Sequence, residues 1–202
     1  MINIIKDIDL YDHLNEYDII LIGTNLYYMM SHGIQLKVML NYPYVYEENL
    51  KTKYADREKL GTILECAKDG EPTFCLCFIT EGNNFRPDLQ KDYLSYDALV
   101  KTLKLGNIQY KGKKIACPFL GTSRFDGNGD RDKVMEIFNK TMTDVNLTIF
   151  DYFQKSRDEE IKEMWTREKA VKKYDYKAYY KIVKERKKQA EERFKKNGHR
   201  RY

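Results

Sequence analysis

The stretch Asp18-Ile19-Ile20-Leu21-Ile22-Gly23-Thr24-Asn25 contains four consecutive aliphatic residues, followed by small and polar ones. A continuous apolar run of this length is typical of a strand that is buried on both faces of a parallel sheet. A helical stretch follows over residues 34–40, preceded by Gly33 and ended by Pro43. These residues therefore predict a buried strand, a loop and a helix that covers one face of a sheet.

The same alternation of strands and helices continues to residue 154. Short apolar runs bounded by turn residues predict strands, and longer runs with a helical period predict helices. The expected strands are residues 2–5, 62–66, 74–80, 114–120 and 147–153, and the expected helices are residues 89–105 and 132–140, with a surface helix or loop at 46–60. Gly106 is expected to end the first of these helices. The pattern predicts a single α/β domain over residues 1–154, with a largely parallel sheet covered on both faces.

The composition excludes several classes of protein. The chain has 202 residues, of which 42% are hydrophobic and 33% charged, enough for one domain with a core and a shorter appendage. Its longest apolar runs are far too short to cross a bilayer, and early charges such as Lys6 and Asp7 interrupt any secretory signal. We therefore expect a soluble, cytoplasmic protein without a membrane partner.

The cysteines and histidines show no metal-binding pattern. The four cysteines lack a C-x-x-C spacing, and the three histidines are scattered. Cys75 and Cys77 lie two apart in an apolar run, which places both on one side of a strand as buried, reduced thiols. Asp126, Asp130 and Asp132 lack the pattern of a calcium loop. We expect neither a metal site nor a cofactor.

Charge is distributed unevenly along the chain. Residues 155–202 contain 18 basic and 9 acidic residues, and this excess of +9 lies within residues 172–202. Tyrosines at helical spacing, such as Tyr176, Tyr179 and Tyr180, predict a helical, basic C-terminal arm over residues 155–202. The densest positive charges of this arm are Lys184, Arg186, Lys187, Lys188, Arg193, Lys195, Lys196, Arg200 and Arg201.

Three roles fit the arm. It could be a solvated helix, a segment that docks on a protein partner or a second copy of the chain, or a binder of nucleic acid. In the last case lysines would pair with phosphates and tyrosines would stack on bases.

Two loops follow buried strands and precede helices, which is where ligands bind in open parallel sheets. The ligand candidates of the first loop are Ser31, His32, Gly33, Ile34 and Gln35. Those of the second loop are Gly121, Thr122, Ser123, Arg124 and Phe125. Backbone amides beside small residues approach a phosphate closely, and the helix that follows adds its positive end. Alternatively, the glycines only make the turns.

Two side chains in these loops carry chemistry of their own. His32 could contact a phosphate or polarise a water molecule, since imidazole titrates near neutral pH. Arg124 offers a planar fork of donors to a phosphate. The alternatives are a solvated or packed histidine and a surface ion pair of the arginine.

The order of these segments resembles the macro domain family. The opening Ile4-Ile5-Lys6-Asp7-Ile8 is similar to the family's strand followed by Gly-Asp-Ile. Residues 18–25 resemble its Asp-x-Ile-Val-Asn-Ala-x-Asn strand, and residues 30–36 its first phosphate loop, closest to the branch of terminal ADP-ribose protein glycohydrolases. Cys117-Pro118-Phe119-Leu120-Gly121 resembles the Pro-x-Ile-Gly strand end, and Phe125-Asp126 the second loop. The resemblance covers roughly residues 2–153.

The resemblance implies a three-layer α/β/α sandwich with a mixed, largely parallel sheet and a cleft for ADP-ribose or a related nucleotide. It implies that Asp7 accepts the adenine amino group, with Ile8 also at the ligand, and that Asn25 lies near the distal ribose. Residues 31–35 and 121–125 would hold the diphosphate. Asp126 falls near the acid that the glycohydrolase branch uses in catalysis.

Some residues depart from the family pattern. Lys6 replaces the glycine before the acid, and the first loop has one glycine where many members have three or four. Glu81 and Gly82 stand where the glycohydrolase branch has its nucleophilic lysine, and a carboxylate cannot form the Schiff-type intermediate of an amine. We therefore expect a degenerate hydrolase, a module that binds ADP-ribose or serves as a scaffold. We expect the basic arm to anchor it in a larger assembly.

The composition, rich in Tyr, Lys and Asn, suits a phage virion as that assembly. Two alternatives differ in class. One is an active ADP-ribose glycohydrolase or ADP-ribose-phosphate phosphatase that uses Asp126 and His32. The other is a nucleic-acid-binding protein that uses the arm, with the domain as a platform. The fold alone does not decide between these functions.

Overall fold

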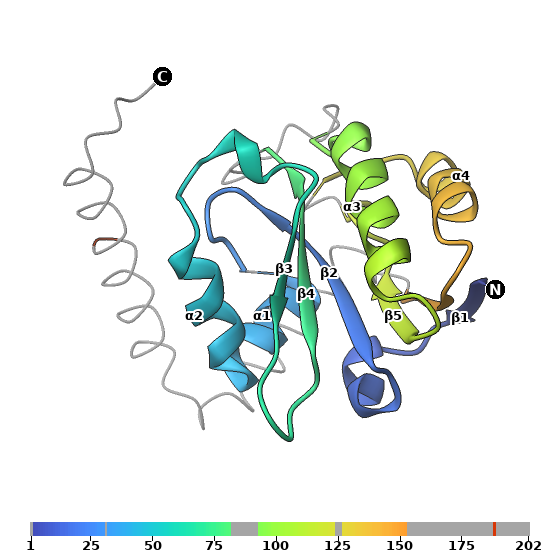
Figure 1. The fold of residues 1–202 in the computed structure, drawn as a ribbon, viewed down its shortest axis with the longest axis horizontal. Helices are drawn as coiled ribbons and strands as arrows, with labels where there is room; N and C mark the ends of the chain where they lie inside the picture. Colours follow the sequence, from blue (N-terminus) through green and yellow to red (C-terminus); the bar gives the residue numbers. More distant parts are fainter. Residues whose placement is uncertain (1, 31, 82–92, 124–126, 153–187, 189–202) are drawn as a thin grey trace, which may run out of the picture. The chain divides into compact units, whose positions relative to one another are not determined.

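The computed structural model describes residues 2–30, 32–81, 93–123, 127–152 and 188. A six-stranded sheet lies between two layers of helices (Figure 1). The strands are β1 (Ile2–Lys6), β2 (Ile19–Asn25), β3 (Ile63–Cys66), β4 (Phe74–Thr80), β5 (Lys114–Pro118) and β6 (Asn146–Asp151). The helices are α1 (Gly33–Asn41), α2 (Pro43–Lys51), α3 (Tyr96–Gln109) and α4 (Arg131–Thr141), with the short 3₁₀ helices η1 (Leu10–Glu16) and η2 (Arg57–Lys59).

The sheet is mixed and largely parallel, which confirms the prediction from the sequence. Its strand order is β1-β6-β5-β2-β4-β3. Every neighbouring pair is parallel except β3 and β4, which are antiparallel at one edge of the sheet. The carboxyl ends of β1, β6, β5, β2 and β4 therefore lie along the same side of the sheet, which we call the carboxyl edge.

The helices cover the two faces separately (Figure 1). Helices α3 and α4 pack on one face, where Leu21, Cys75, Ile115 and Ile149 share a core with them. Helices α1 and α2 lie on the other face, with Val38 of α1 fully buried, and the 3₁₀ helix η1 contacts α1. This is the three-layer arrangement that the alternation of strands and helices predicted.

The aliphatic run of β2 is the centre of both cores. All seven residues of β2 are buried, and so are all seven of β4. Successive side chains of a strand point to opposite faces, so Ile19 and Leu21 enter the core of α3 and α4 while Ile20 and Ile22 enter the other. Each fully buried aliphatic side chain of this kind contributes about 1.5–3 kcal/mol to stability.

The thiols are buried and unpaired, as predicted. Cys75 and Cys77 lie on the same side of β4, and neither they nor Cys66 and Cys117 form a disulfide. Burial raises the pKa of the Cys66 and Cys75 thiols to about 12. These thiols are therefore protonated at neutral pH and are poor nucleophiles.

Gly106 does not end α3, contrary to the prediction. The helix continues to Gln109, and Gly106 is buried within it, where a Cβ atom would stand 3.7 Å from Ile63 Cδ1 of β3. A Cβ atom at this distance would make an ordinary van der Waals contact, so the packing does not require a glycine here. Pro43 ends α1 as predicted and also begins α2, because a missing N–H is no loss in the first turn of a helix.

The remaining predictions fall partly outside the described residues. These include residues 89–92 of the helix predicted over 89–105 and residue 153 of the last strand; residues 93–95 are described but precede α3 and are not helical, so the predicted start of that helix is wrong. Of the predicted arm only Lys188 is described, as a helical and exposed residue, so the boundary at residue 154 stays a prediction. Within the described part of the chain, no helix has the length and hydropathy needed to cross a bilayer.

Replacing Phe138 by Ala tests the core between the sheet and α4. Phe138 is 0% exposed, and its truncation is expected to lower the free energy of unfolding by about 3–5 kcal/mol. Urea unfolding would measure this change. The matched control is Ile108→Ala on α3, where the side chain is 76% exposed and the change should stay within about 0.5 kcal/mol. Equal effects of the two substitutions would contradict this packing.

Candidate functional site

The connections of the sheet indicate where a ligand would bind. Strands β2 and β5 are neighbours, but their ladder covers only Ile19 with Ile115 and Ile20 with Ala116. From its carboxyl end β2 leads to α1 on one face, whereas β5 leads to α4 on the other face. In open α/β sheets, ligands bind beyond the strand ends where neighbouring connections leave to opposite faces. The two loops predicted from the sequence lie at this point of the carboxyl edge.

Asp7 lies at the end of β1 on the carboxyl edge. Its backbone N–H donates to the Asp151 carbonyl at 3.1 Å, which closes the β1–β6 ladder, and its φ of 60° is unusual for a residue with a side chain. The carboxylate is exposed, and the described residues offer it no hydrogen bond or ion pair. Ile8, also 41% exposed, follows it. An acceptor and an apolar side chain are thus presented to solvent together.

Asn25, at the end of β2, is 7% exposed and shapes the loop that follows. Its Nδ2 donates to the Met29 carbonyl at 2.8 Å. Its Oδ1 accepts from the backbone N–H groups of Tyr27 at 2.9 Å and Met29 at 3.3 Å. The resemblance implies that this side chain lies near a ribose, and in the structure its amide bonds to the backbone of Tyr27 and Met29.

The first loop joins α1 to β2 through a side chain. Gln35 Nε2 donates to the Gly23 carbonyl at 2.6 Å, while Ile34 is half-buried beside it. Gly33 has a φ of 51°, and a Cβ atom there would meet no atom within 4 Å. The glycine is therefore required by the backbone conformation and leaves open space beside the start of α1.

His32 precedes α1, and its side chain does not cap the helix. It is exposed, yet the protein atoms around its imidazole displace water and lower its pKa below the usual value of 6.5. The ring is therefore mainly neutral at pH 7. Ser31, the other polar candidate of this loop, lies outside the described residues.

The glycines of the second loop are explained by packing. A Cβ atom at Gly127 would lie 2.2 Å from the Gly121 carbonyl oxygen, and one at Gly121 would lie 2.5 Å from Leu94 Cδ1. At Gly129 a Cβ atom would lie 2.5 Å from Leu94 Cδ2, and its N–H donates to the Gly121 carbonyl at 2.9 Å. The loop thus folds back on itself and against Leu94, which favours the interpretation that these glycines make the turn.

The polar residues of the second loop also bond within it. The Thr122 hydroxyl donates to the Phe119 carbonyl at 3.1 Å. The Ser123 carbonyl accepts from the N–H groups of Gly127 at 3.1 Å and Asn128 at 2.9 Å. The predicted site residues Arg124, Phe125 and Asp126 lie outside the described residues.

Arg131 is a cation at the carboxyl edge that the sequence pattern did not indicate. Its guanidinium donates to Asp151 Oδ1 and lies 4.3 Å from the centre of the Phe119 ring. These contacts with Asp151 and Phe119 hold the guanidinium beside the ends of β5 and β6. Arg131 lies in the first turn of α4. The usable signal would have been its position directly after the second loop.

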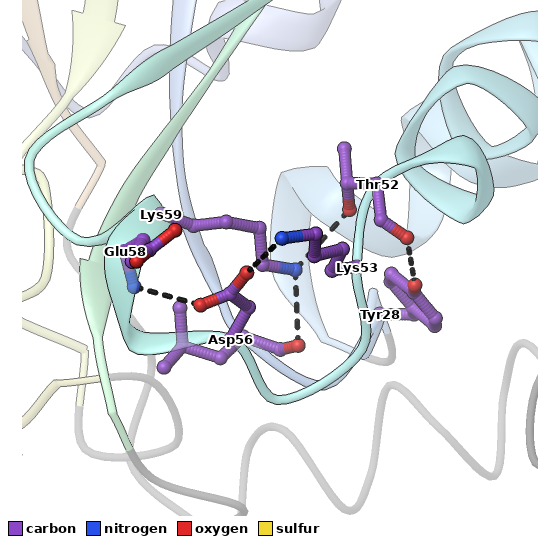
Figure 2. A network of polar contacts seen from close by, with 7 residues as sticks. Tyr28, Thr52, Lys53, Asp56, Glu58 and Lys59 are labelled. Carbon is purple, nitrogen blue, oxygen red and sulfur yellow. Dashed lines mark hydrogen bonds and ion pairs between the residues drawn. The ribbon is translucent and has the colours of Figure 1, made fainter. Parts of the chain in front are cut away.

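Lys59 of η2 is the second residue that the sequence did not indicate. Its side chain is buried in contact with the loop after β2 (Figure 2). Burial lowers its pKa to about 8, against the smaller opposing effect of Asp56. Nearby, Glu81 follows β4 and pairs with Arg57 at 3.3 Å.

The carboxyl edge can therefore offer a carboxylate, a fixed guanidinium and the backbone of two shaped loops. Within the described ranges, no group of three or more His, Cys, Asp or Glu side chains could hold a metal ion. An open depression also exists at the opposite, amino edge of the sheet, where it is lined by Glu16, Tyr17, Lys114, Asn146 and Thr148. It contains none of the residues that the sequence selected.

Comparison with protein-family models and with curated proteins found no match for the sequence. Solved structures do match. The macrodomain of Mycobacterium tuberculosis DarG is 17% identical, with a TM-score of 0.54 over 75% of this chain and 97% of that one. The macrodomain of Thermus aquaticus DarG is 13% identical, with a TM-score of 0.56 over 75% of this chain and 98% of that one.

A third match is Thermosipho africanus DarTG, solved in complex with ADP-ribose. It is 16% identical, with a TM-score of 0.57 over 76% of this chain and 43% of that one. These identities are low, so the likeness is one of fold. The mixed, largely parallel sheet between two helical layers is consistent with it, as is the order of motifs in the sequence. This chain therefore has the fold of a macro domain.

Proposed function

We propose that the domain binds ADP-ribose, or a related nucleoside diphosphate, at the carboxyl edge of its sheet. The observation that carries the proposal is the Asp7 carboxylate, which is exposed and has no partner among the described residues. A carboxylate in this position can accept the adenine amino group, the role that the resemblance implies. The fold shared with a protein solved in complex with ADP-ribose supports the same ligand.

The two loops suit a diphosphate. The start of α1 presents N–H groups and the positive end of the helix, and the absence of a side chain at Gly33 leaves space beside it. The Arg131 guanidinium adds a positive charge near the second loop, although Asp151 offsets part of it. Binding would thus depend mainly on backbone donors, with Asn25 and Gln35 holding those donors in place.

We further propose that lysine-dependent hydrolysis has been lost. Glu81 occupies the position after β4, and its carboxylate pairs with Arg57 instead of offering an amine. An amine is needed to form a covalent intermediate of the imine type. The alternative of an enzyme that uses Asp126 and His32 stays a prediction, because Asp126 lies outside the described residues.

The role of the arm also remains a prediction from sequence. Anchoring in a larger assembly and binding of nucleic acid rest on the basic charge of residues 172–202, and a phage origin rests on the composition rich in Tyr, Lys and Asn. Among residues 172–202 the structure describes Lys188 alone.

Calorimetric titration of ADP-ribose into the full chain tests the binding proposal. We expect binding in the micromolar range, and we expect Asp7→Ala to weaken it about tenfold or more through loss of a charged hydrogen bond. The matched control is Asp12→Ala, an exposed carboxylate on η1 that should leave affinity unchanged. Thermal unfolding of both variants would show that they are folded. Absence of binding at millimolar ADP-ribose would refute the proposal.

Incubation with a protein that carries ester-linked ADP-ribose tests the loss of hydrolysis. We expect no release of ADP-ribose even when the chain is equimolar with the substrate, because Glu81 supplies no nucleophilic amine. Release that Asp126→Asn abolishes would instead establish the enzyme, with the same variant serving as control for a contaminating hydrolase.

A further inference from the structure

Lys59 is a buried cation whose described hydrogen-bond acceptors are uncharged. It is 9% exposed, although lysine is rarely buried without a partner. Its Nζ donates to the Leu26 carbonyl at 3.1 Å and to Thr52 Oγ1 at 3.2 Å. It also lies 4.7 Å from the centre of the Phe78 ring and 4.9 Å from that of Tyr28, within the range of cation–π attraction. Figure 2 shows the Lys59 amine beside Thr52, with the Asp56 side chain from the same segment nearby.

These contacts hold the loop that follows β2. The Leu26 carbonyl accepts from Lys59 and also from the Ala55 N–H at 2.9 Å. The Tyr28 hydroxyl donates to the Thr52 carbonyl, and Tyr28 has a φ of 60°, a conformation that its surroundings must maintain. Residues 52–59 thus hold residues 26–28 through several hydrogen bonds, and the Lys59 ammonium makes one of them.

Residues 26–28 lead directly into the proposed binding site. Leu26 follows Asn25, whose amide bonds as far as Met29, and the loop then reaches His32 and α1. A shift of Leu26 would therefore displace the backbone that presents N–H groups at the start of α1. Lys59 would act through this backbone, since the described contacts of its amine are with Leu26, Thr52 and two aromatic rings.

We propose that Lys59 is a positioning residue for ligand binding, whose protonated amine holds residues 26–30 in the conformation that binds the nucleotide. This inference rests on the function proposed above and adds a pH dependence to it. Loss of the proton would remove the cation–π attraction to Phe78 and Tyr28 and weaken the hydrogen bond to Leu26.

Among the described residues, few charged groups surround the Lys59 amine. Asp56 raises its pKa, while it also pairs with Lys53 at 3.6 Å and accepts the Glu58 N–H at 3.0 Å. The Tyr28 phenol faces it from the loop after β2, and β4 contributes the uncharged ring of Phe78. Burial outweighs Asp56, so the pKa lies at about 8 instead of the usual 10.5.

This pKa makes affinity and stability change in opposite directions. Ligand affinity should fall as pH rises through about 8, because the cation is lost. The folded domain binds fewer protons than the unfolded chain between about pH 8 and 10.5, so the contribution of Lys59 to stability should increase over the same window. A residue that acted only on stability would not weaken binding while the domain became more stable.

The test is titration of ADP-ribose into the full chain between about pH 6.5 and 9.5 at constant ionic strength, with denaturant unfolding in parallel. The diphosphate keeps its charge over this range. We expect about a fivefold loss of affinity between pH 7 and 9, the size of one cation–π contact. Lys59→Met should already bind weakly at pH 7 and show no step, whereas Lys104→Met, which removes an exposed lysine of α3, should keep the step.

Affinity that does not change with pH in the wild type, or a step that persists in Lys59→Met, would overturn the inference. The second result would assign the step to another group, such as the amino terminus, which titrates near pH 8 in most proteins.

Amide hydrogen exchange of residues 26–30 separates this inference from the proposed function. Without ligand at pH 7, Lys59→Met should lower the protection of these amides relative to Lys104→Met, and equal protection would overturn the inference. If Lys59→Met does not fold, protection in the wild type should fall between pH 7 and 9, and constant protection would be the overturning result. The wild type could fail to bind ADP-ribose at any pH while Lys59→Met still shows lower protection. That result would reject the proposed ligand but support the role of Lys59 in holding the loop.

Discussion

The burial of β2 on both faces is the constraint on which the rest of the domain depends. A strand without a solvent-facing side needs a hydrogen-bonded neighbour on each edge and a helical layer on each face. Strands β4 and β5 supply the edges, and α1 and α2 on one face and α3 and α4 on the other supply the layers. Because β2 ends beside β5, the loop after it emerges at the point where the neighbouring connections diverge.

The carboxyl edge is built mostly from groups that shape backbone. The Asn25 side-chain amide hydrogen-bonds to the loop after β2, and the Gln35 side-chain amide donates to Gly23 within β2. Gly121 and Gly127 allow a contact that any side chain would block. The buried thiols have raised pKa values and form no reactive pair. The described groups at this edge thus include backbone N–H groups and the side chains that position them, which is what the proposed binding of a diphosphate requires.

Lys59 shows how a charged residue can serve such a site without touching the ligand. Its desolvation opposes the charged form, while two acceptors and two aromatic rings favour it. Taken together these opposing effects bring its proton equilibrium close to neutral pH. The same burial that makes the contact specific therefore makes it sensitive to pH.

The strands, their approximate bounds and the two loops could be predicted from the sequence, because apolar runs and turn residues act locally. The order of these segments also sufficed to indicate the macro domain fold. Contacts between distant segments could not be predicted. Gly106 resembles a helix stop, yet α3 continues through it to Gln109, and the close approach of Gly121 to Leu94 has no signal in the local pattern.

Lys59 is the clearest case, because it stands in the charged run Asp56-Arg57-Glu58-Lys59, which resembles a solvated turn. The hydropathy of a short segment and the spacing of its apolar residues indicate whether it becomes a strand or a helix and which face it buries. Whether a given glycine, amide or lysine shapes a loop or stays free for a ligand depends on atoms that are far away in the chain. That choice is made only when the sheet and its two helical layers close around β2.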